Sequence, residues 1–523
     1  MPSFLSRPRP PIRHAAAPIL AAAASLLFLL SGQAHAFAFQ DVAERARELA
    51  SRAYAPAPDR LPEELEKLSY DQYRSIRFDP AKALWRSQGL PFEVMFFHLG
   101  KYQTHPVAIN EITAQGVRRI AFDPRDFDYG SNGLSPQHWG DLGVAGFRVH
   151  YALNAPDYKD ELVVFLGASY FRAVGQGQRY GLSGRGLAID TGGAQGEEFP
   201  RFVEFWLERP APQATSLVIH ALLDSPRAAG AYRFLLQPGR DTVIDVQARL
   251  YLRAGVTTLG LAPLTSMYLH GENQPRTGDF RPEVHDSDGL MVATGDAPAG
   301  GEWLWRPLVN PARPLVTSFA ARDLKGFGLM QRDRSFASYE DTEARYERRP
   351  SYWITPQGHW GPGRIELVQL PTPDETNDNI VAYWVPERPP RPGEPLDYAY
   401  QISWQGDQPQ RPPAGWTVQS RFGHGFAPPG RPRDPNEVQY VVDFDGPALR
   451  ELPADAAVAA VASASANARV VEHNAYRSQA TGFWRMTLRI ERLQPARPVE
   501  VRAFLEHDHS ALTETWATIL PPD

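Results

Sequence analysis

The residues that decide the fold lie between positions 201 and 255, where RFVEFWLE (201–208), SLVIHALL (216–223), AYRFLLQPG (231–239) and TVIDVQARLYLRAG (242–255) follow one another. These segments are short and rich in aromatic and β-branched residues, and turn-forming residues separate them. No helical pattern lies between them, although a parallel βαβ sheet would require one. The stretch therefore predicts consecutive antiparallel strands.

The same texture extends outward along the chain, and the fold class predicted from it is all-β. Helical spacing is confined to the region before residue 92, where Val42, Ala46 and Leu49 recur behind an expected Asp41 cap. Leu61, Leu65 and Leu68 indicate a second helix in the same way. The further predicted strands are FEVMFFHLG (92–100), HPVAINEITAQGVRRIAF (105–122), GFRVHYAL (146–153), ELVVFLGASYFRAV (161–174) and RIELVQLP (364–371).

A proline-rich stretch, PERPPRPGEP at 386–395, predicts a stiff linker between two domains. The domain before it, residues 37–385, is expected to be a large β-sandwich. The domain after it, residues 396–523, has the size and strand texture of an immunoglobulin-like sandwich. An alanine run at 456–468 is compatible with a turn, a helical insertion or a weak strand.

The first 36 residues have the three parts of a cleavable secretory signal. Arg7, Arg9 and Arg13 form a positive region, an apolar run follows from 15 to 30, and Ala34-His35-Ala36 supplies a small-x-small cleavage pattern. The apolar run is shorter than the roughly 20 residues of a spanning helix. We therefore expect a secreted protein without a stable membrane anchor.

Composition narrows the range of functions. The chain has no cysteine, which excludes disulfides and thiolate sites, and its net charge of −6 argues against nucleic acid as a partner. The 14 histidines show no ligand spacing, so neither a metal site nor a cofactor is predicted, with carboxylate-bound calcium left open. The 12 Trp, 20 Tyr and 26 Phe lie in segments that also carry charge and turn residues. Because aromatic faces stack on sugars, a carbohydrate groove is the simplest interpretation, although most of these rings are expected in the core.

Three aspartates are candidates for acid–base chemistry. Asp286 and Asp288 lie in HDSDG, where two acids two positions apart can raise one pKa. Asp378 directly precedes the apolar strand 380–384 and suits a general acid or base. The alternative for each is a hydrogen bond to a turn backbone. Sequence alone does not show whether they face one cleft.

Eleven segments of the chain, in order, carry a resemblance to a known family: YDQYRSIRF, FLGASYFRA, YGLSGRGLA, GEEFP, ALLDSPRAAGAYRF, APLTSM, RPEVHDSDGL, GEWLWRPL, KGFGLMQRDR, RPSYWI and DNIVAYWVP. They resemble segments of the periplasmic glucan biosynthesis proteins G and D, which act on osmoregulated glucans with a β-1,2-linked glucose backbone. An ordinary signal without twin arginines favours the G branch. The resemblance implies a periplasmic location and a large sandwich of the galactose-mutarotase type.

The resemblance also implies inverting, glycoside-hydrolase-like activity on β-1,2-glucan. Asp378 takes the general-acid role and Asp286 the general-base role through a relay, while Asp288 is close enough to be the base instead. The expected partner is the glucan itself, and a homodimer is left open. Substrate-binding residues are expected to be Asp288, Tyr170, Arg172, Arg185, Glu197, Trp303, Trp305, Trp360 and Trp384.

Two other classes of function compete with hydrolysis. The chain is alternatively a glucan-binding assembly factor that guides nascent polymer or assists branching without useful turnover. A structural or protein-interaction module fits the C-terminal sandwich better than the whole chain.

Overall fold

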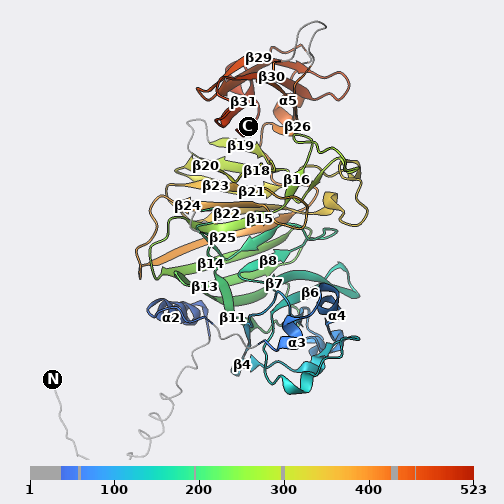
Figure 1. Cartoon of the computed structure of the whole chain (residues 1–523), viewed down its shortest axis with the longest axis vertical. Helices are drawn as coiled ribbons and strands as arrows, with labels where there is room; N and C mark the ends of the chain where they lie inside the picture. Colours follow the sequence, from blue (N-terminus) through green and yellow to red (C-terminus); the bar gives the residue numbers. More distant parts are fainter. Residues whose placement is uncertain are drawn as a thin grey trace, which may run out of the picture. The chain divides into compact units, whose positions relative to one another are not determined.

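Packed sheets dominate the computed structural model of the chain (Figure 1). It describes residues 37–56, 61–193, 196–295, 301–425, 434–453 and 455–522. The predicted signal at 1–36 lies outside the described residues. The all-β fold class is confirmed.

One sheet has 15 strands, which come from segments throughout the described chain, from β3 to β33. Its β11 to β14 are the stretch 201–255, and they pair antiparallel in sequence order as predicted. In order across the sheet, the strands are β28 (Ala459–Ala464), β31 (Val499–His507), β33 (Thr515–Leu520), β19 (Glu302–Pro307), β18 (Gly289–Thr294), β21 (Leu324–Met330), β22 (Ser351–Gln357), β25 (Pro395–Gln405), β14 (Thr242–Leu252), β13 (Ala228–Gln237), β12 (Leu217–Asp224), β11 (Arg201–Glu208), β3 (Ala108–Thr113) and β4 (Gly116–Ile120), with β32 (Ser510–Ala511) beside β31.

A second sheet of 10 strands contributes the walls of the site described below. Its strands, in order, are β2 (Glu93–Phe97), β6 (Gly146–Ala155), β7 (Tyr158–Leu166), β8 (Tyr170–Ala173), β9 (Ser183–Arg185), β15 (Leu259–Ser266), β24 (Ile380–Pro386), β23 (Gly363–Gln369) and β20 (Leu315–Ala321), with β10 (Leu187–Ile189) beside β15.

The remaining strands form smaller sheets, and the helices are short. A four-stranded sheet has the order β26 (Trp416–Gly423), β27 (Glu437–Asp445), β30 (Trp484–Arg492) and β29 (Ala468–Arg477). Two-stranded sheets join β1 (Arg77–Phe78) to β5 (Phe127–Asp128) and β16 (Tyr268–His270) to β17 (Val284–His285). The α-helices are α2 (Phe39–Ala50), α3 (Glu63–Glu66), α4 (Tyr70–Ser75) and α5 (Pro447–Arg450), and the 3-10 helices are η1 (Pro80–Lys82), η2 (Arg86–Gln88), η3 (Pro124–Asp126), η4 (Pro136–His138), η5 (Phe336–Ser338) and η6 (Tyr346–Arg348).

The core of the large sandwich is an aromatic layer between the two large sheets. Phe165 of β7 lies 5.2 Å from Phe234 of β13, and Phe147 of β6 lies 5.0 Å from Phe205 of β11, measured between ring centroids. The alternation along β14 buries Ile244, with its alternate neighbours, on the same inner face. Each fully buried aliphatic side chain contributes about 1.5–3 kcal/mol.

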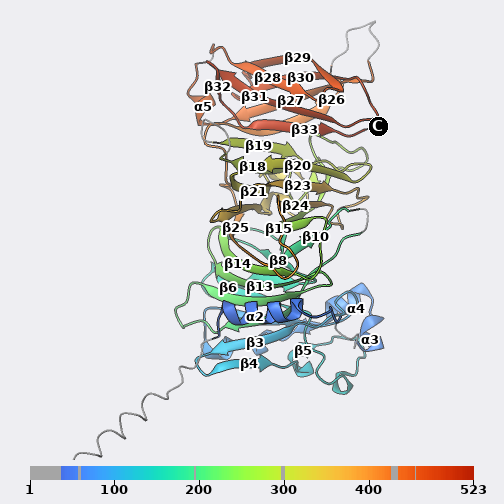
Figure 2. The same ribbon diagram turned by 90° about the vertical axis from the view of Figure 1, so that its left-hand side faces the viewer.

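Helix α2 covers the outer face of the sheet at β12 to β14 (Figure 2). It buries Val42, Ala43 and Ala46, which confirms the predicted apolar stripe. The helix begins at Phe39, so Asp41 lies within the first turn and the prediction that it caps the helix was wrong. The second predicted helix is instead two short ones, α3 and α4, with Ser69 forming a capping box at the second.

The predicted boundary at 386–395 does not separate two domains. Strand β25, expected to open the small domain, pairs along its whole length with β14 on one side and largely with β22 on the other. The prolines therefore connect β24 of one large sheet to β25 of the other. The prediction failed because proline density marks an irregular segment without indicating where the next strand pairs.

The C-terminal sandwich packs the four-stranded sheet against β28, β31 and β33. These three strands continue the 15-stranded sheet, because β33 pairs in parallel with β19. The alanine run supplies β28, which selects the strand among the alternatives left open. No helix in the described ranges is both long and apolar enough to span a membrane.

Candidate active site

Asp378 lines a cleft of about 400 Å³ at the 10-stranded sheet. The residue stands directly before β24, and its neighbour Asn379 fixes that position. The Asn379 side chain accepts from the Tyr268 backbone N–H at 2.8 Å and donates to the Leu370 carbonyl at 2.9 Å. The other residues lining the cleft are Phe97, Gln103, Glu161, Val164, Leu166, Tyr170, Phe171, Arg172 and Tyr180.

The surroundings of Asp378 favour its protonated form. Burial raises the pKa of the Asp378 carboxyl, and the nearby Asp286 carboxylate raises that pKa further. Arg172 and Arg349 oppose this increase. The Arg172 Nη2 lies 3.7 Å from Asp378 Oδ2, while its Nε donates to Ser183 Oγ at 2.6 Å.

Asp286 is buried, with 4% of its surface exposed, and it is not among the described residues that line this cleft. Its carboxylate accepts a hydrogen bond from the guanidinium of Arg349, which lies 4.2 Å from the Tyr346 ring centroid. The backbone N–H of Asp286 donates to the Met267 carbonyl at 2.8 Å. The fold thus brings the two predicted catalytic aspartates within electrostatic reach, although they are far apart in sequence.

Asp288 lines a different cavity from the cleft that Asp378 lines. Its carboxylate accepts from the Arg332 backbone N–H at 3.1 Å and lines a cavity of about 20 Å³ with Glu283 and His285. Burial raises the pKa of the Asp288 carboxyl. Because the described lining of this cavity does not overlap with that of the Asp378 cleft, the prediction that Asp288 binds substrate finds no support in the geometry.

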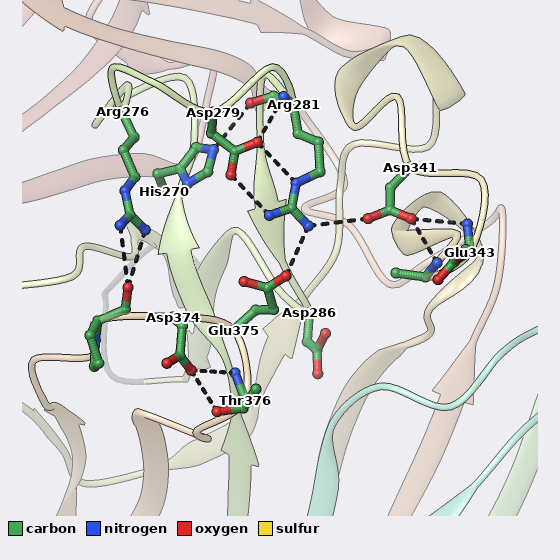
Figure 3. A network of polar contacts seen from close by, with 12 residues as sticks. His270, Arg276, Asp279, Arg281, Asp286, Asp341, Glu343, Asp374, Glu375 and Thr376 are labelled. Atoms are coloured by element: carbon green, nitrogen blue, oxygen red, sulfur yellow. Dashed lines mark hydrogen bonds and ion pairs between the residues drawn. The ribbon is translucent and has the colours of Figure 1, made fainter.

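The loop that carries Asp378, residues 371–379, is held by two arginines of the segment between β16 and β17 (Figure 3). Arg281 donates to Glu375 of the loop at 3.0 Å, and also to Asp279 and Asp341. Arg276 donates to the Pro373 carbonyl at 3.3 Å. In Figure 3 the Asp286 carboxylate points away from the Arg281 network.

The cleft continues beyond Asp378. A groove of about 890 Å³ shares Phe97 and Leu166 with it and is lined by Tyr70, Tyr73 and Arg74, among others. The two hollows therefore adjoin at Phe97 and Leu166, and both are lined by aromatic, cationic and acidic side chains. Aromatic rings and charged groups side by side suit binding of a sugar.

Comparison with known proteins places the chain in a family. The model of the family described as "Periplasmic glucan biosynthesis protein, MdoG" matches residues 37–520. The chain belongs to this family. It is a protein of periplasmic glucan biosynthesis, as the resemblance implied.

Relatives within the periplasmic glucan biosynthesis family cover nearly the whole chain. "Glucans biosynthesis protein G" of Ralstonia nicotianae is 54% identical over 504 residues, which cover 96% of this chain and 99% of the relative. The proteins with the same name from Pseudomonas aeruginosa and Pectobacterium atrosepticum are 49% and 48% identical, covering 97% and 95% of this chain and 97% and 96% of the relatives. The predicted G branch is confirmed.

Four predicted substrate-binding residues of this family member line the cleft or support its wall. Tyr170 and Arg172 line it directly. Arg185 is 2% exposed, with its guanidinium carbon 5.1 Å from the Tyr170 ring centroid, and it donates to Glu197 at 2.7 Å. Arg185 and Glu197 therefore position Tyr170 and are not free to bind sugar hydroxyls.

The four tryptophans that were predicted to bind substrate pack against other side chains of the protein. Trp384 is fully buried and Trp305 is 4% exposed beneath the Arg332 guanidinium, so substrate contact was a wrong prediction for both. Trp303 stacks on Trp353 at 5.8 Å, and Trp360 packs on Trp384 at 6.2 Å. Neither Trp303 nor Trp360 is among the described residues that line the cleft. Large aromatics are mostly core residues, and sequence does not distinguish the exceptions.

Sequence reasoning missed the two arginines that organise the site. Arg349 pairs with Asp286, and Arg281 holds the Asp378 loop. Both begin segments that carry the family resemblance, RPSYWI and RPEVHDSDGL. Their partners lie in distant segments, so no local spacing could have indicated them.

Proposed function

We propose that the chain is an inverting endo-hydrolase of β-1,2-glucan, acting on the backbone during periplasmic glucan assembly. The observation that carries the proposal is Asp378, a carboxyl that lines a cleft of about 400 Å³ and whose surroundings raise its pKa. A protonated carboxyl at that place donates a proton to the leaving glycosidic oxygen.

Asp286 is the proposed general base. Its low exposure means that it activates the attacking water through a relay rather than by direct contact. Arg349 orients the carboxylate, and the electrostatic effect of Asp286 on the pKa of Asp378 supports the assignment of both aspartates to one site. Inverting enzymes need such a pair of carboxyls on opposite faces of the sugar.

The test is incubation of purified protein with linear β-1,2-glucan, followed by counting reducing ends. Asp378→Asn removes the acid and should lower kcat at least about 100-fold, the usual contribution of general acid catalysis. Asp286→Asn should lower it as well. NMR of the first product should show the α-anomer, because inversion converts the β-linkage.

Asp157→Asn, at an exposed turn between β6 and β7, is the matched control and should keep the wild-type rate. Hydrolysis by the Asp378→Asn variant at the control's rate would refute the acid assignment. A β-anomer as first product would refute inversion.

A glucan-binding assembly factor is the second candidate, and the burial of Asp286 favours it. In that case the cleft binds linear β-1,2-glucan, but no reducing ends appear on long incubation. Calorimetric binding beside the same hydrolysis assay separates the two functions.

A further inference from the structure

A small polar cavity lies between the segment that carries Asp286 and strand β26 of the C-terminal sandwich. Its volume is about 20 Å³, enough for one water or one ion. Glu272, Glu283, His285 and Asp288 line it from the large sandwich, and Thr417 lines it from β26. Its described lining shares no residue with that of the Asp378 cleft, so metal binding here can be measured separately from the proposed hydrolysis.

The cavity has more acidic groups than local cations. Asp333 lies within hydrogen-bonding reach of Asp288, which brings a fourth carboxyl to Glu272, Glu283 and Asp288. The guanidinium of Arg332, which also lines the cavity, is already paired with a carboxylate outside this group.

Arg332 forms a two-pronged ion pair with the buried Glu514, at 2.6 and 2.9 Å. The charge of this guanidinium lowers the pKa of Asp288, but the guanidinium itself is paired with Glu514, a fifth carboxylate. Burying several carboxyls together is costly unless a cation compensates them.

His285 presents the nitrogen that a metal ion would need. The Gln331 amide NH₂ donates to the carbonyls of His285 and Tyr346, at 3.0 and 3.3 Å, so its oxygen faces His285 Nδ1 at 2.9 Å. Nδ1 therefore carries the proton and donates it to Gln331. Nε2 lies 2.8 Å from Glu283 Oε2 and donates its proton to that carboxylate in the metal-free protein. A metal ion would replace this proton and take Nε2 as a ligand. A histidine that ligates metal is held in this way by a hydrogen bond from its other nitrogen.

The ligand geometry matches one ion. Oxygen atoms of Glu283 and Asp333 and a ring nitrogen of His285 all lie within 4.8 Å of one another. Two ligand atoms of a tetrahedral zinc ion, each roughly 2.1 Å from the metal, are about 3.4 Å apart, so the three side chains would move closer together around the ion.

A second observation points to a ligand from the opposite wall. Thr417 is 2% exposed, and its Oγ1 is buried without a hydrogen-bond partner among the described residues. A buried hydroxyl without a partner is rare and requires an explanation such as a water or an ion. A metal ion carrying one water would supply that partner.

We propose that Glu283, His285 and Asp333 bind a divalent transition-metal ion, with Asp288, Glu272 and the Thr417 hydroxyl around it. One imidazole and carboxylates form a donor set typical of Zn²⁺ or Mn²⁺. The spacing of the histidines in sequence did not indicate the site, because Asp333 comes from a distant segment. The ion links the segment carrying Asp286 to the C-terminal sandwich.

The experiment uses the full protein without a histidine tag. It is stripped with a chelator, dialysed against Zn²⁺ or Mn²⁺ and assayed by mass spectrometry for metal content. We expect about one equivalent of bound metal and a higher Tm than for the stripped protein, because a ligand that binds only the folded state stabilises it. Glu283→Gln and Asp333→Asn, two separate isosteric changes, should each lose the metal and the Tm increase, whereas Asp157→Asn should keep both.

Metal content at background level with an unchanged Tm in the unmodified protein would overturn the proposal. In that case His285 and Glu283 form a simple ion pair and the carboxyls hold protons. Metal retained by both folded variants would also overturn it, because the ion would then bind elsewhere. The measurement on the unmodified protein tests the proposal by itself, even if a variant fails to fold.

Discussion

Asp378 lines a cleft of about 400 Å³, yet the protein around it raises the pKa of its carboxyl. Burial is the main cause of its raised pKa, and Asp286 adds to it. Arg172 limits the increase through the guanidinium 3.7 Å away. Arg172 therefore both lines the cleft and limits the pKa of Asp378.

The general-acid role proposed for Asp378 predicts how the proposed hydrolysis depends on pH. Activity should be high below the raised pKa of Asp378 and should fall as pH increases through it, because the general acid then loses its proton. In Arg172→Gln the opposing charge is absent, so the basic limb of the kcat/KM profile should move to higher pH. A limb that stays in place, or moves to lower pH, would contradict the assignment of that limb to Asp378.

At the scale of elements, the loop 371–379 depends on Arg281. This side chain joins Glu375 of the loop to Asp279 and Asp341, and all four groups are at most partly exposed. A network of several partly buried charges is worth more than an isolated surface pair. Arg276 adds a contact to the Pro373 backbone.

Arg281→Gln should release the loop. Hydrogen exchange at residues 372–379 should accelerate, and kcat should fall more than global stability, because Asp378 loses its fixed position. Arg276→Gln removes one weaker contact and is the comparison variant, with a smaller effect expected. Equal exchange in wild type and Arg281→Gln would show that Asn379 alone holds the loop.

At the scale of the whole molecule, the C-terminal sandwich shares both a hydrophobic cluster and a sheet with the large sandwich. Met291, Trp305 and Trp353 of the large sandwich share one hydrophobic cluster with Trp516 and Leu488 of the C-terminal strands. Strand β33 extends the large sheet through β19. The two sandwiches therefore stabilise each other.

Truncation tests this dependence. A chain ending at residue 394 loses β25 from between β14 and β22 and should fail to fold, because the large sheet is broken in its middle. A chain ending at residue 411 keeps β25 but exposes Trp305 and Trp353, so it should fold with a lower Tm and a tendency to aggregate. A chain ending at 394 with wild-type circular dichroism and Tm would contradict the strand pairing.

The sequence by itself determined the fold class and the strands, since period-two alternation and turn residues act locally. The stretch 201–255 predicted four antiparallel neighbours, and β11 to β14 pair in that way. The sequence also indicated Asp286 and Asp378 as candidates, because packing does not require acids beside a strand.

Tertiary structure alone decided which of these residues meet. Asp286 and Asp288 are two positions apart, yet Asp286 affects the pKa of Asp378 whereas Asp288 lines a separate small cavity. Their backbone N–H groups donate to different segments, at the Met267 and Met330 carbonyls. Tertiary structure also placed β25 in the large sheet and buried Trp384. Strand partners, burial and ion pairs such as Arg349 with Asp286 depend on segments far apart in the chain, and local patterns carry no information about that distance.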